Sequence, residues 1–236
     1  MNKSIISMHQ AEFFPWIGFF KKMAMCEQFV LFDNAQYNKK DFQNRNKIKC
    51  FNEYKWIKIP VRKHKITTSM KEIIIDNSTD WKKKINKSII LEYKSTPYFE
   101  EVYNLIQPIL EKEWTFLFDL NKEFIISVKE YLGINTKVIL SSDLVDNTEL
   151  FYGLDATQKI IYICKCLNAD TFISGIHGKD YLNEYKFQIN QINLDYMEFY
   201  YQNSCTKFSI IHELFYHGKD TVKQFDKVEI ADENLY

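Results

Sequence analysis

The sequence predicts an α/β protein, with a mostly parallel β-sheet flanked by helices and a helical insertion at about residues 79–133. Two observations favour this class. Short apolar runs that end in polar residues alternate with longer helix-like segments in the first and the last third of the chain. Only 6 Gly and 4 Pro occur among the 236 residues, so no Gly-rich or Pro-rich stretch marks a linker, and we expect one domain over residues 1–236.

The start of the chain predicts a strand-helix-strand unit. Ile5–His9 is a short apolar run that ends in polar residues, which indicates a buried strand. Pro15 begins a helix pattern that continues to Cys26, since proline is tolerated in the first turn of a helix. Gln28–Asp33 is apolar inside and ends in a carboxylate, which predicts a second strand. Two strands joined by a helix favour a right-handed crossover and a parallel pair.

The rest of the chain continues the alternation. Residues 34–53 are polar, aromatic and basic without a clear period, so we expect a long ordered loop, and long loops in compact domains are typically functional. The other expected strands are Lys55–Val61, Lys71–Asp76, Lys137–Ser141, Thr171–Ser174 and residues 194–201. The expected helices are residues 79–94, 97–112, 114–132, 155–168 and 179–188, with helical covering from Phe208 onward. Such sheets bind ligands at the carboxyl ends of their strands.

The charge distribution points to an anionic ligand. The 31 basic residues balance the 31 acidic ones, so net charge gives no reason to propose a nucleic-acid partner or an anionic membrane for the molecule as a whole. Residues 1–65, however, carry 13 basic and 5 acidic side chains, a surplus of 8. We therefore expect an anionic ligand to dock on the N-terminal third.

The cysteines and the N-terminus indicate an intracellular protein. The five cysteines are odd in number, and the close pair Cys164 and Cys166 lacks a second pair or histidines at ligand spacing. Neither a disulfide framework nor a metal site is therefore expected. The N-terminus lacks a signal-peptide pattern, and no window approaches 18 apolar residues, so we expect a cytoplasmic protein with no membrane insertion.

Polar side chains follow the predicted strands. They are His9 and Gln10, Asp33 and Asn34, Ser141 to Asp143, and Ser174 and Gly175. In a parallel sheet they gather at one edge, although any strand also needs polar residues where it meets solvent. His9, with an ordinary pKa of about 6.5, suits the role of general base. Asp33 is the second candidate catalytic residue: it orients His9, takes a proton itself or binds a sugar hydroxyl, and the sequence does not separate these roles.

The segment from Gln36 to Lys49 combines basic side chains with amides and aromatics. Arginine binds a phosphate or carboxylate through two parallel hydrogen bonds, and amides offer both donors and acceptors. We expect a phosphorylated or nucleotide-linked small molecule here, and a solvated charged loop is the alternative. The candidate binding residues are Gln36, Lys39, Lys40, Asn44, Arg45 and Lys47, together with Gln10.

A late turn adds further candidates. Between the predicted strand at Thr171–Ser174 and the following helix, two glycines leave backbone N–H groups available to an anion. The candidates are Ser174, Gly175, Gly178, Lys179 and Tyr181. The alternative is that the glycines serve only backbone conformation or close packing.

Six stretches together resemble a known family. They are residues 9–20, 29–37 and 43–49 near the start, and residues 56–61, 174–182 and 208–218 further along. The chain resembles the WbqC-like protein family nearly end to end. Members typically belong to bacterial surface-polysaccharide and O-antigen (lipopolysaccharide) loci, where they are proposed to attach an aminoacyl or acyl group, such as glycyl, to an amino sugar. The resemblance therefore implies a transferase, an N-acyltransferase that modifies a nucleotide-linked amino sugar such as a dTDP-sugar.

The same resemblance implies the co-substrate and the partners. We expect no tightly bound cofactor, and a carrier-protein or coenzyme A thioester as the activated acyl donor. An acyl or peptidyl carrier protein is thus a candidate partner, nucleic acid is not expected, and a homo-oligomer is left open. In this scheme Lys39, Arg45 and Lys47 hold the pyrophosphate or the donor, and His9 or Asp33 takes the proton of the attacking amine.

Two other functions stay open. A histidine after the first strand, a Pro-x-x-Gly helix start at Pro15 and a late Ser-Gly turn with a lysine resemble the Rossmann-like, nucleotidyltransferase-like fold of pantothenate synthetases and cytidylyltransferases. That likeness implies an adenylate-forming or nucleotidyl-transferring enzyme. The second alternative is a non-catalytic subunit that binds a sugar nucleotide.

Overall fold

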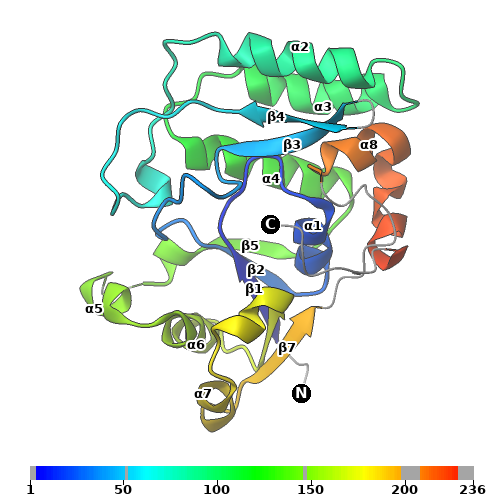
Figure 1. Cartoon of the computed structure of the whole chain (residues 1–236). Coiled ribbons are helices and arrows are strands. Elements are labelled where there is room, and N and C mark those ends of the chain that lie inside the picture. The colour runs from blue at the N-terminus through cyan, green and yellow to red at the C-terminus, as the bar shows by residue number, and fades with distance from the viewer. Residues whose placement is uncertain (1–3, 51–52, 146–147, 198–207, 228–236) are drawn as a thin grey trace.

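The computed structural model describes residues 4–50, 53–145, 148–197 and 208–227. Its centre is a five-stranded sheet in which every neighbouring pair of strands is parallel (Figure 1). In their order across the sheet, the strands are β5 (Lys137–Leu140), β2 (Gln28–Leu31), β1 (Ile5–His9), β6 (Thr171–Gly175) and β7 (Asn193–Met197). The predicted α/β class with a mostly parallel sheet is confirmed.

The order of the strands reverses its direction at β1. β1, α1 (Ile17–Ala24) and β2 form the predicted strand-helix-strand unit. Ser7 of β1 lies opposite both Phe29 of β2 and Ile173 of β6. The chain adds β2 and β5 on one side of β1 before it adds β6 and β7 on the other. Open parallel sheets bind ligands at such a reversal, outside the carboxyl ends of the strands.

Two hydrophobic cores cover the two faces of the sheet. Side chains alternate between the faces of a strand, so Phe29 and Leu31 enter the larger core while Val30 enters the smaller one. The larger core contains side chains of α1, α4 (Leu117–Tyr131) and α8 (Ile211–His217). The smaller core contains side chains of α6 (Ala156–Cys166) and α7 (Glu184–Ile189).

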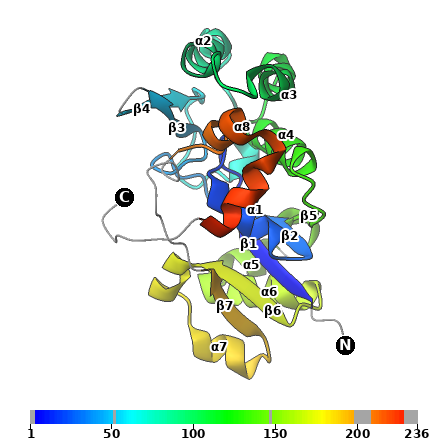
Figure 2. The ribbon, with the colours of Figure 1, turned by 90° about the vertical axis from the view of Figure 1, so that its right-hand side faces the viewer.

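A second layer packs against the sheet through the larger core, on the side away from α6 and α7 (Figure 1, Figure 2). It consists of the antiparallel pair β3 (Arg45–Cys50) and β4 (Glu53–Lys58), hereafter the ribbon, with α2 (Trp81–Tyr93) and α3 (Phe99–Glu111) beyond it. Ile48 and Ile57 of the ribbon belong to the larger core. The remaining short elements are η1 (Met70–Glu72), η2 (Ser141–Asp143), α5 (Thr148–Gly153), η3 (Ile176–Asp180) and η5 (Gly218–Lys227).

The long loop predicted at residues 34–53 is wrong in its second half, because Arg45–Cys50 forms β3. Asn46 and Ile48 are buried while Arg45 and Lys47 stay partly exposed, which is the period of two that a strand imposes. Lysine and asparagine have low strand propensity, and β3 is stabilised by its pairing with β4. Such a partner is not visible in the local sequence.

The strand predicted at Lys71–Asp76 is also wrong. Met70–Glu72 forms a 3₁₀ turn, and Ile75 makes an isolated antiparallel bridge to Val61. Glu72 caps the turn, since one of its carboxylate oxygens accepts hydrogen bonds from Ser69 N at 3.2 Å and Ser69 Oγ at 2.6 Å. This capping box favours a helical turn over the extended chain that the apolar run had indicated.

Two later boundaries differ from the prediction. The helix expected at residues 179–188 begins at Glu184, because the chain first makes the 3₁₀ turn η3. The strand expected at residues 194–201 is β7 as far as Met197, and residues 198–201 lie outside the described residues. α2, α3 and α4 lie where the helical insertion was predicted.

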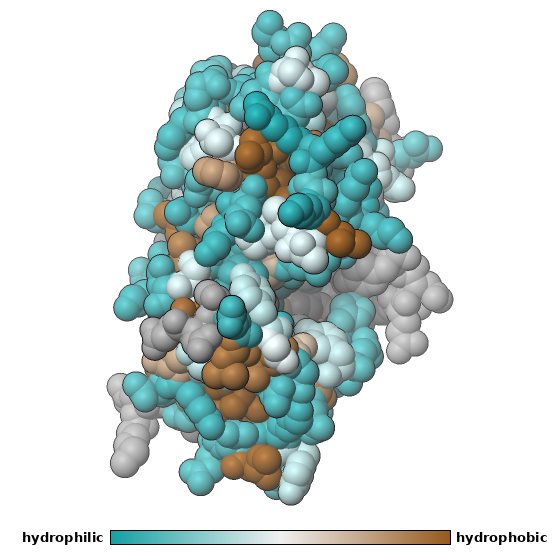
Figure 3. Space-filling model, turned by 90° about the vertical axis from the view of Figure 1, so that its left-hand side faces the viewer, coloured by the Kyte–Doolittle hydropathy of each residue, from teal (hydrophilic) through white to brown (hydrophobic). Residues whose placement is uncertain are grey.

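The molecular surface is mainly polar on the face seen in Figure 3, and its hydrophobic surface is divided into small separate areas. Among the helices in the described ranges, none combines the length and the apolar composition that crossing a bilayer requires.

Candidate functional site

The chain that leaves β1 runs against the start of the ribbon. Phe13 N donates a hydrogen bond of 2.9 Å to Phe42 O, and Gln43 Nε2 donates one to Gln10 Oε1. Asn46 Nδ2 donates to Phe13 O at 3.1 Å. These bonds join the carboxyl end of the first strand to the basic segment, so the two parts that carry most of the predicted site residues fold together.

Asn121 of α4 holds both segments at once. Its side chain is fully buried, and Nδ2 donates hydrogen bonds to Ala11 O at 3.1 Å and to Gln43 O at 2.8 Å. One amide therefore satisfies buried carbonyl groups on both sides of the junction. α4 thereby fixes the spacing between the segment after β1 and the start of β3.

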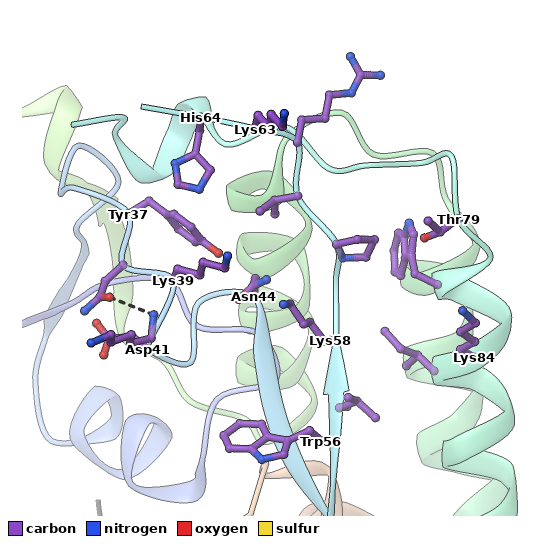
Figure 4. A pocket seen from close by; sticks show the side chains of 18 of the residues that line it. Tyr37, Lys39, Asp41, Asn44, Trp56, Lys58, Lys63, His64, Thr79 and Lys84 are labelled. Atoms are coloured by element: carbon purple, nitrogen blue, oxygen red, sulfur yellow. Dashed lines mark hydrogen bonds between the residues drawn. The ribbon is translucent and has the colours of Figure 1, made fainter. Parts of the chain in front are cut away.

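A cavity of about 1760 Å³ opens beside this junction (Figure 4). Its wall is formed by Gln10, by the segment before β3, by β4 with the turn that follows, and by one side of α2. The basic residues that line it are Lys39, Lys40, Lys55, Lys58, Arg62, Lys63, Lys84 and Lys87. Within the described part of the chain, Asp41 is the one carboxylate residue that lines it. This imbalance favours an anionic ligand.

One face of the ribbon consists of basic and aromatic side chains. Residues directly opposite each other in an antiparallel pair share a face. The pairs on this face are Arg45 with Lys58, Lys47 with Trp56, and Lys49 with Tyr54. Arg45 Cζ lies 4.6 Å from the centroid of the Trp56 ring, a cation–π distance. Trp56 and Lys58 also line the cavity, so this face forms part of its wall.

Arg45 and Lys47 lie beside the cavity and are not among its lining residues. Arg45 Nη2 donates a hydrogen bond of 2.7 Å to Lys40 O. The guanidinium therefore connects the segment that carries Lys40 to the Trp56 ring. The sequence had instead predicted that Arg45 binds a phosphate through two parallel hydrogen bonds. Whether Arg45 and Lys47 bind a ligand stays a prediction.

His9 ends β1 with 31% of its side-chain surface exposed. Its Nδ1 lies 3.0 Å from Gln10 O, and because a carbonyl only accepts, this contact places the hydrogen on Nδ1 and a lone pair on Nε2. The ring packs edge-on against Phe19 with 5.1 Å between centroids. Desolvation, assisted by the charge of Lys22, lowers the pKa of His9 to about 3. The imidazole is therefore neutral at physiological pH.

Two charged groups beside His9 were not predicted. Glu12 Oε1 lies 3.9 Å from His9 Nδ1, and Glu12 Oε2 is buried with no hydrogen-bond partner among the described residues. Burial raises the pKa of Glu12 to about 8. Burial also lowers the pKa of Lys22 to about 8, and Lys22 Nζ donates to Met8 O at 3.1 Å. No local signal distinguishes these two residues from surface charges of a helix and a loop.

Asp33 links two strand ends. Its side chain is 2% exposed, and Oδ1 accepts hydrogen bonds from Ser141 Oγ at 2.8 Å and Ser142 N at 2.9 Å. These contacts join the carboxyl ends of β2 and β5, as the gathering of polar residues at one edge had suggested. They also give Asp33 a structural reason to be buried.

The turn after β6 lies apart from the cavity wall. The five candidates there, none of which lines the cavity, are Ser174, Gly175, Gly178, Lys179 and Tyr181. A Cβ at Gly178 would lie 2.1 Å from Ser174 Oγ, so close packing requires glycine at this position. Lys179 Nζ lies 5.2 Å from the centroid of the Tyr196 ring. A binding role for this turn stays a prediction.

The structure thus brings together only part of the predicted set. The predicted binding residues that line the cavity are Gln10, Gln36, Lys39, Lys40 and Asn44. Sequence analysis missed Tyr37, Trp56 and Lys58, which line it as well. The alternation in the predicted strand at residues 55–61 was the signal that places Trp56 and Lys58 on one face.

Two comparisons with known proteins find a match. The model of the WbqC-like protein family matches residues 10–224. The chain is 30% identical over 196 residues to "Uncharacterized protein Rv1507c" of Mycobacterium tuberculosis, and the match covers 82% of each chain. No solved structure matches significantly. Because the family match spans most of the chain, including the ribbon, the cavity wall and every strand of the sheet except β1, the chain belongs to the WbqC-like protein family.

Proposed function

We propose that the protein is an N-acyltransferase that transfers an acyl group, such as glycyl, to a nucleotide-linked amino sugar in bacterial surface-polysaccharide or O-antigen biosynthesis. The observation that carries the proposal is the basic cavity whose wall includes Gln10, the residue after His9 at the carboxyl end of β1; His9 itself is not one of the lining residues. A diphosphate needs the positive wall, and an attacking amine needs a neutral proton acceptor nearby. The family resemblance supports the choice of amino sugar and acyl group.

The cavity supplies the binding contacts. Lys39 and Lys58 extend from opposite walls toward the same space in Figure 4 and are suited to the two phosphates of a nucleotide sugar. Trp56, which is 40% exposed, offers a ring surface to the base or the sugar. A volume of about 1760 Å³ accommodates a nucleotide sugar together with the end of an acyl donor.

The edge of β1 supplies the proton acceptor. In transfer, the amine nitrogen attacks the acyl carbon, a proton leaves the nitrogen, and the leaving group departs with the electrons of the broken bond. His9 Nε2 holds a lone pair and accepts that proton. Gln10 Oε1 is occupied by Gln43, which leaves Gln10 Nε2 as a donor for the oxyanion, a contact worth roughly 3–4 kcal/mol in known enzymes.

The donor in this scheme is a thioester of coenzyme A or of an acyl or peptidyl carrier protein, and no tightly bound cofactor takes part. The reaction then belongs in the cytoplasm, where nucleotide sugars and thioesters occur together. In this scheme, neither the attack of the amine nor the departure of the thiol requires a metal ion.

The direct test is incubation of the purified protein with a dTDP-linked amino sugar and glycyl or acyl thioesters. The proposal predicts an amide product, detected by mass spectrometry as the mass of the sugar nucleotide plus the acyl group. If no thioester yields the amide while the sugar nucleotide binds, acyl transfer is wrong and a non-catalytic binding subunit takes its place.

A second candidate function is adenylate formation or nucleotidyl transfer. It is favoured by the all-parallel sheet with a histidine at the carboxyl end of β1, the layout from which it was first suggested. Release of pyrophosphate from ATP or CTP by the purified protein supports it, and failure of both nucleotides to bind contradicts it.

A further inference from the structure

Two buried polar atoms in the cavity wall have no hydrogen-bond partner among the described residues. They are Tyr37 Oη and Asn44 Oδ1. Tyr37 is 3% exposed and Asn44 is fully buried. In Figure 4 the hydroxyl of Tyr37 points toward the amino group of Lys39 and toward Asn44. Buried polar groups in native proteins nearly always have partners, so two orphans in one wall indicate a ligand that supplies them.

The chemistry of each atom is fixed by its surroundings. Asn44 Nδ2 donates a hydrogen bond of 2.9 Å to Ile59 O, which orients the amide and leaves Oδ1 as an acceptor. Desolvation raises the pKa of Tyr37 to about 12 against the opposing charge of Arg45, so the phenol keeps its proton and is a donor. The Tyr37 ring is held edge-on against His64 with 5.0 Å between centroids. The pair therefore presents one donor and one acceptor in fixed positions.

The charges around Tyr37 and Asn44 limit which chemical groups the ligand carries. Lys39, Lys40 and Lys58 line the same cavity and supply positive charge without any acceptor of their own. An anionic oxygen therefore suits the Tyr37 hydroxyl, and an O–H or N–H group on the same ligand suits Asn44 Oδ1. A sugar phosphate carries both groups close together, since the phosphate oxygens on the anomeric carbon lie near the hydroxyl or amino groups of the sugar ring.

We propose that Tyr37 and Asn44 form the recognition pair for the glycosyl phosphate portion of the nucleotide sugar. Tyr37 Oη donates to a phosphate oxygen, and Asn44 Oδ1 accepts a hydrogen bond from a hydroxyl or amino group of the sugar. This inference rests on the proposed function for the identity of the ligand, and it assigns the sugar end of that ligand to the inner wall near the junction with Gln10.

Binding is measured by calorimetry with three probes, namely pyrophosphate, dTDP and a dTDP-linked amino sugar, and no acyl donor is present. Tyr37→Phe removes only the hydroxyl and is expected to weaken all three by roughly 10- to 100-fold, the loss of one hydrogen bond to a charged group. Its melting temperature is expected to equal or exceed that of the wild type, because the hydroxyl has no partner to lose. Unchanged affinity with a lower melting temperature means a structural hydroxyl and overturns the proposal.

For Asn44→Ala, the informative quantity is the difference between its loss of affinity for dTDP and its loss of affinity for the dTDP-linked amino sugar. Binding of the dTDP-linked amino sugar is expected to weaken by about tenfold more than binding of dTDP. If Asn44→Ala loses equal affinity for dTDP and for the dTDP-linked amino sugar, Asn44 does not contact the sugar. Such a loss would come from misfolding at the bond to Ile59 or from a contact with the base. Tyr37→Phe still tests the phosphate contact. Tyr131→Phe deletes a hydroxyl on α4, outside the cavity wall, and is expected to leave all three affinities unchanged.

These results are independent of transfer. A wild type that binds the sugar nucleotide but forms no amide contradicts acyl transfer and leaves the recognition pair standing. If the wild type transfers the acyl group and Tyr37→Phe binds the probes as tightly as the wild type, the proposed function stands and the recognition pair is wrong. If the wild type binds none of the three probes, both the proposed function and the recognition pair are wrong.

Discussion

His9 keeps a lone pair over an unusually wide pH range, because burial lowers its pKa to about 3. It is therefore a proton acceptor throughout the physiological range but a weak base. In the proposed reaction, His9 accepts a proton that has become acidic, namely that of an amine whose nitrogen has begun to bond to the acyl carbon. The contacts with the Gln10 carbonyl and the Phe19 ring fix the position of the imidazole.

His9→Asn is predicted to lower kcat by roughly 10²- to 10⁴-fold, the usual contribution of a positioned acid or base. In the wild type, the acidic limb of kcat/KM is predicted to follow the pKa of the substrate amine, tested with two amino sugars of different amine pKa. A limb that stays near pH 6.5 with both substrates contradicts this assignment.

Asp33→Asn, at a carboxylate held by Ser141 and Ser142, is predicted to lower stability and leave kcat per folded molecule unchanged.

Glu12 makes stability depend on pH. Burial raises its pKa from 4.5 to about 8, opposed by Lys22 and assisted by Asp41. The folded state then keeps a proton that the unfolded state releases, so the contribution of Glu12 to stability is complete below about pH 4.5 and is lost as pH rises to about 8. Glu12→Gln cannot release this proton.

The melting temperature of Glu12→Gln, relative to the wild type, is therefore predicted to rise between pH 5 and pH 8.5. A difference between the two proteins that is the same at both pH values contradicts the buried, protonated state of Glu12. The lowered pKa of His9 has the opposite effect, a loss of stability as pH falls from about 6.5 toward 3, but both proteins contain His9 and this effect cancels in the difference between them.

At the scale of elements, the site exists because the ribbon docks on the segment that leaves β1. Asn121 contributes two hydrogen bonds to this docking from α4. Asn121→Ala is predicted to lower the free energy of unfolding by about 1–3 kcal/mol, since it leaves buried carbonyl groups unpaired. Asn190→Ala, which removes a local bond of 2.7 Å to Lys186 O in α7, is predicted to cost less than about 0.5 kcal/mol. Urea unfolding measures both, and equal losses contradict a special role of Asn121.

The ribbon also sets the charge of the cavity. Lys58→Met is predicted to weaken dTDP binding by roughly 2- to 5-fold at low salt, and by less as salt is raised, because the contact is electrostatic and partly exposed. Lys94→Met is the matched control, since Lys94 is also an exposed lysine but follows α2 outside the cavity wall. Calorimetry at two salt concentrations decides the matter, and equal effects of the two variants contradict a specific phosphate contact.

The ribbon is also the element that the sequence predicted least well. Residues 5–33 carry strong local signals, namely an apolar run, a proline at a helix start and a second apolar run, and β1, α1 and β2 appear there. β3 has no such signal, because Arg45, Lys47 and Lys49 resemble a solvated segment until β4 is placed beside them. The predicted loop was therefore wrong about the backbone that presents these side chains, and the ligand chemistry expected of them stays a prediction.

At the scale of the whole molecule, a chain with no net charge places eight of its 31 basic residues in the wall of one cavity. The surplus of basic residues in the first 65 positions predicted an anion site there, and the cavity is lined mainly from that part of the chain. Lys84 and Lys87 of α2 reach the cavity from the helical insertion, which no local pattern foretold. Glu12 and Lys22 were missed for a related reason, since their burial depends on packing between distant segments.

The most direct measurement is a crystal structure with a dTDP-linked amino sugar bound. The account predicts phosphate oxygens within hydrogen-bond distance of Lys39 or Lys58, and the amino group on the side of the cavity that adjoins Gln10 and His9. A sugar nucleotide bound at the turn of residues 174–181, or with its amino group directed away from β1, contradicts it.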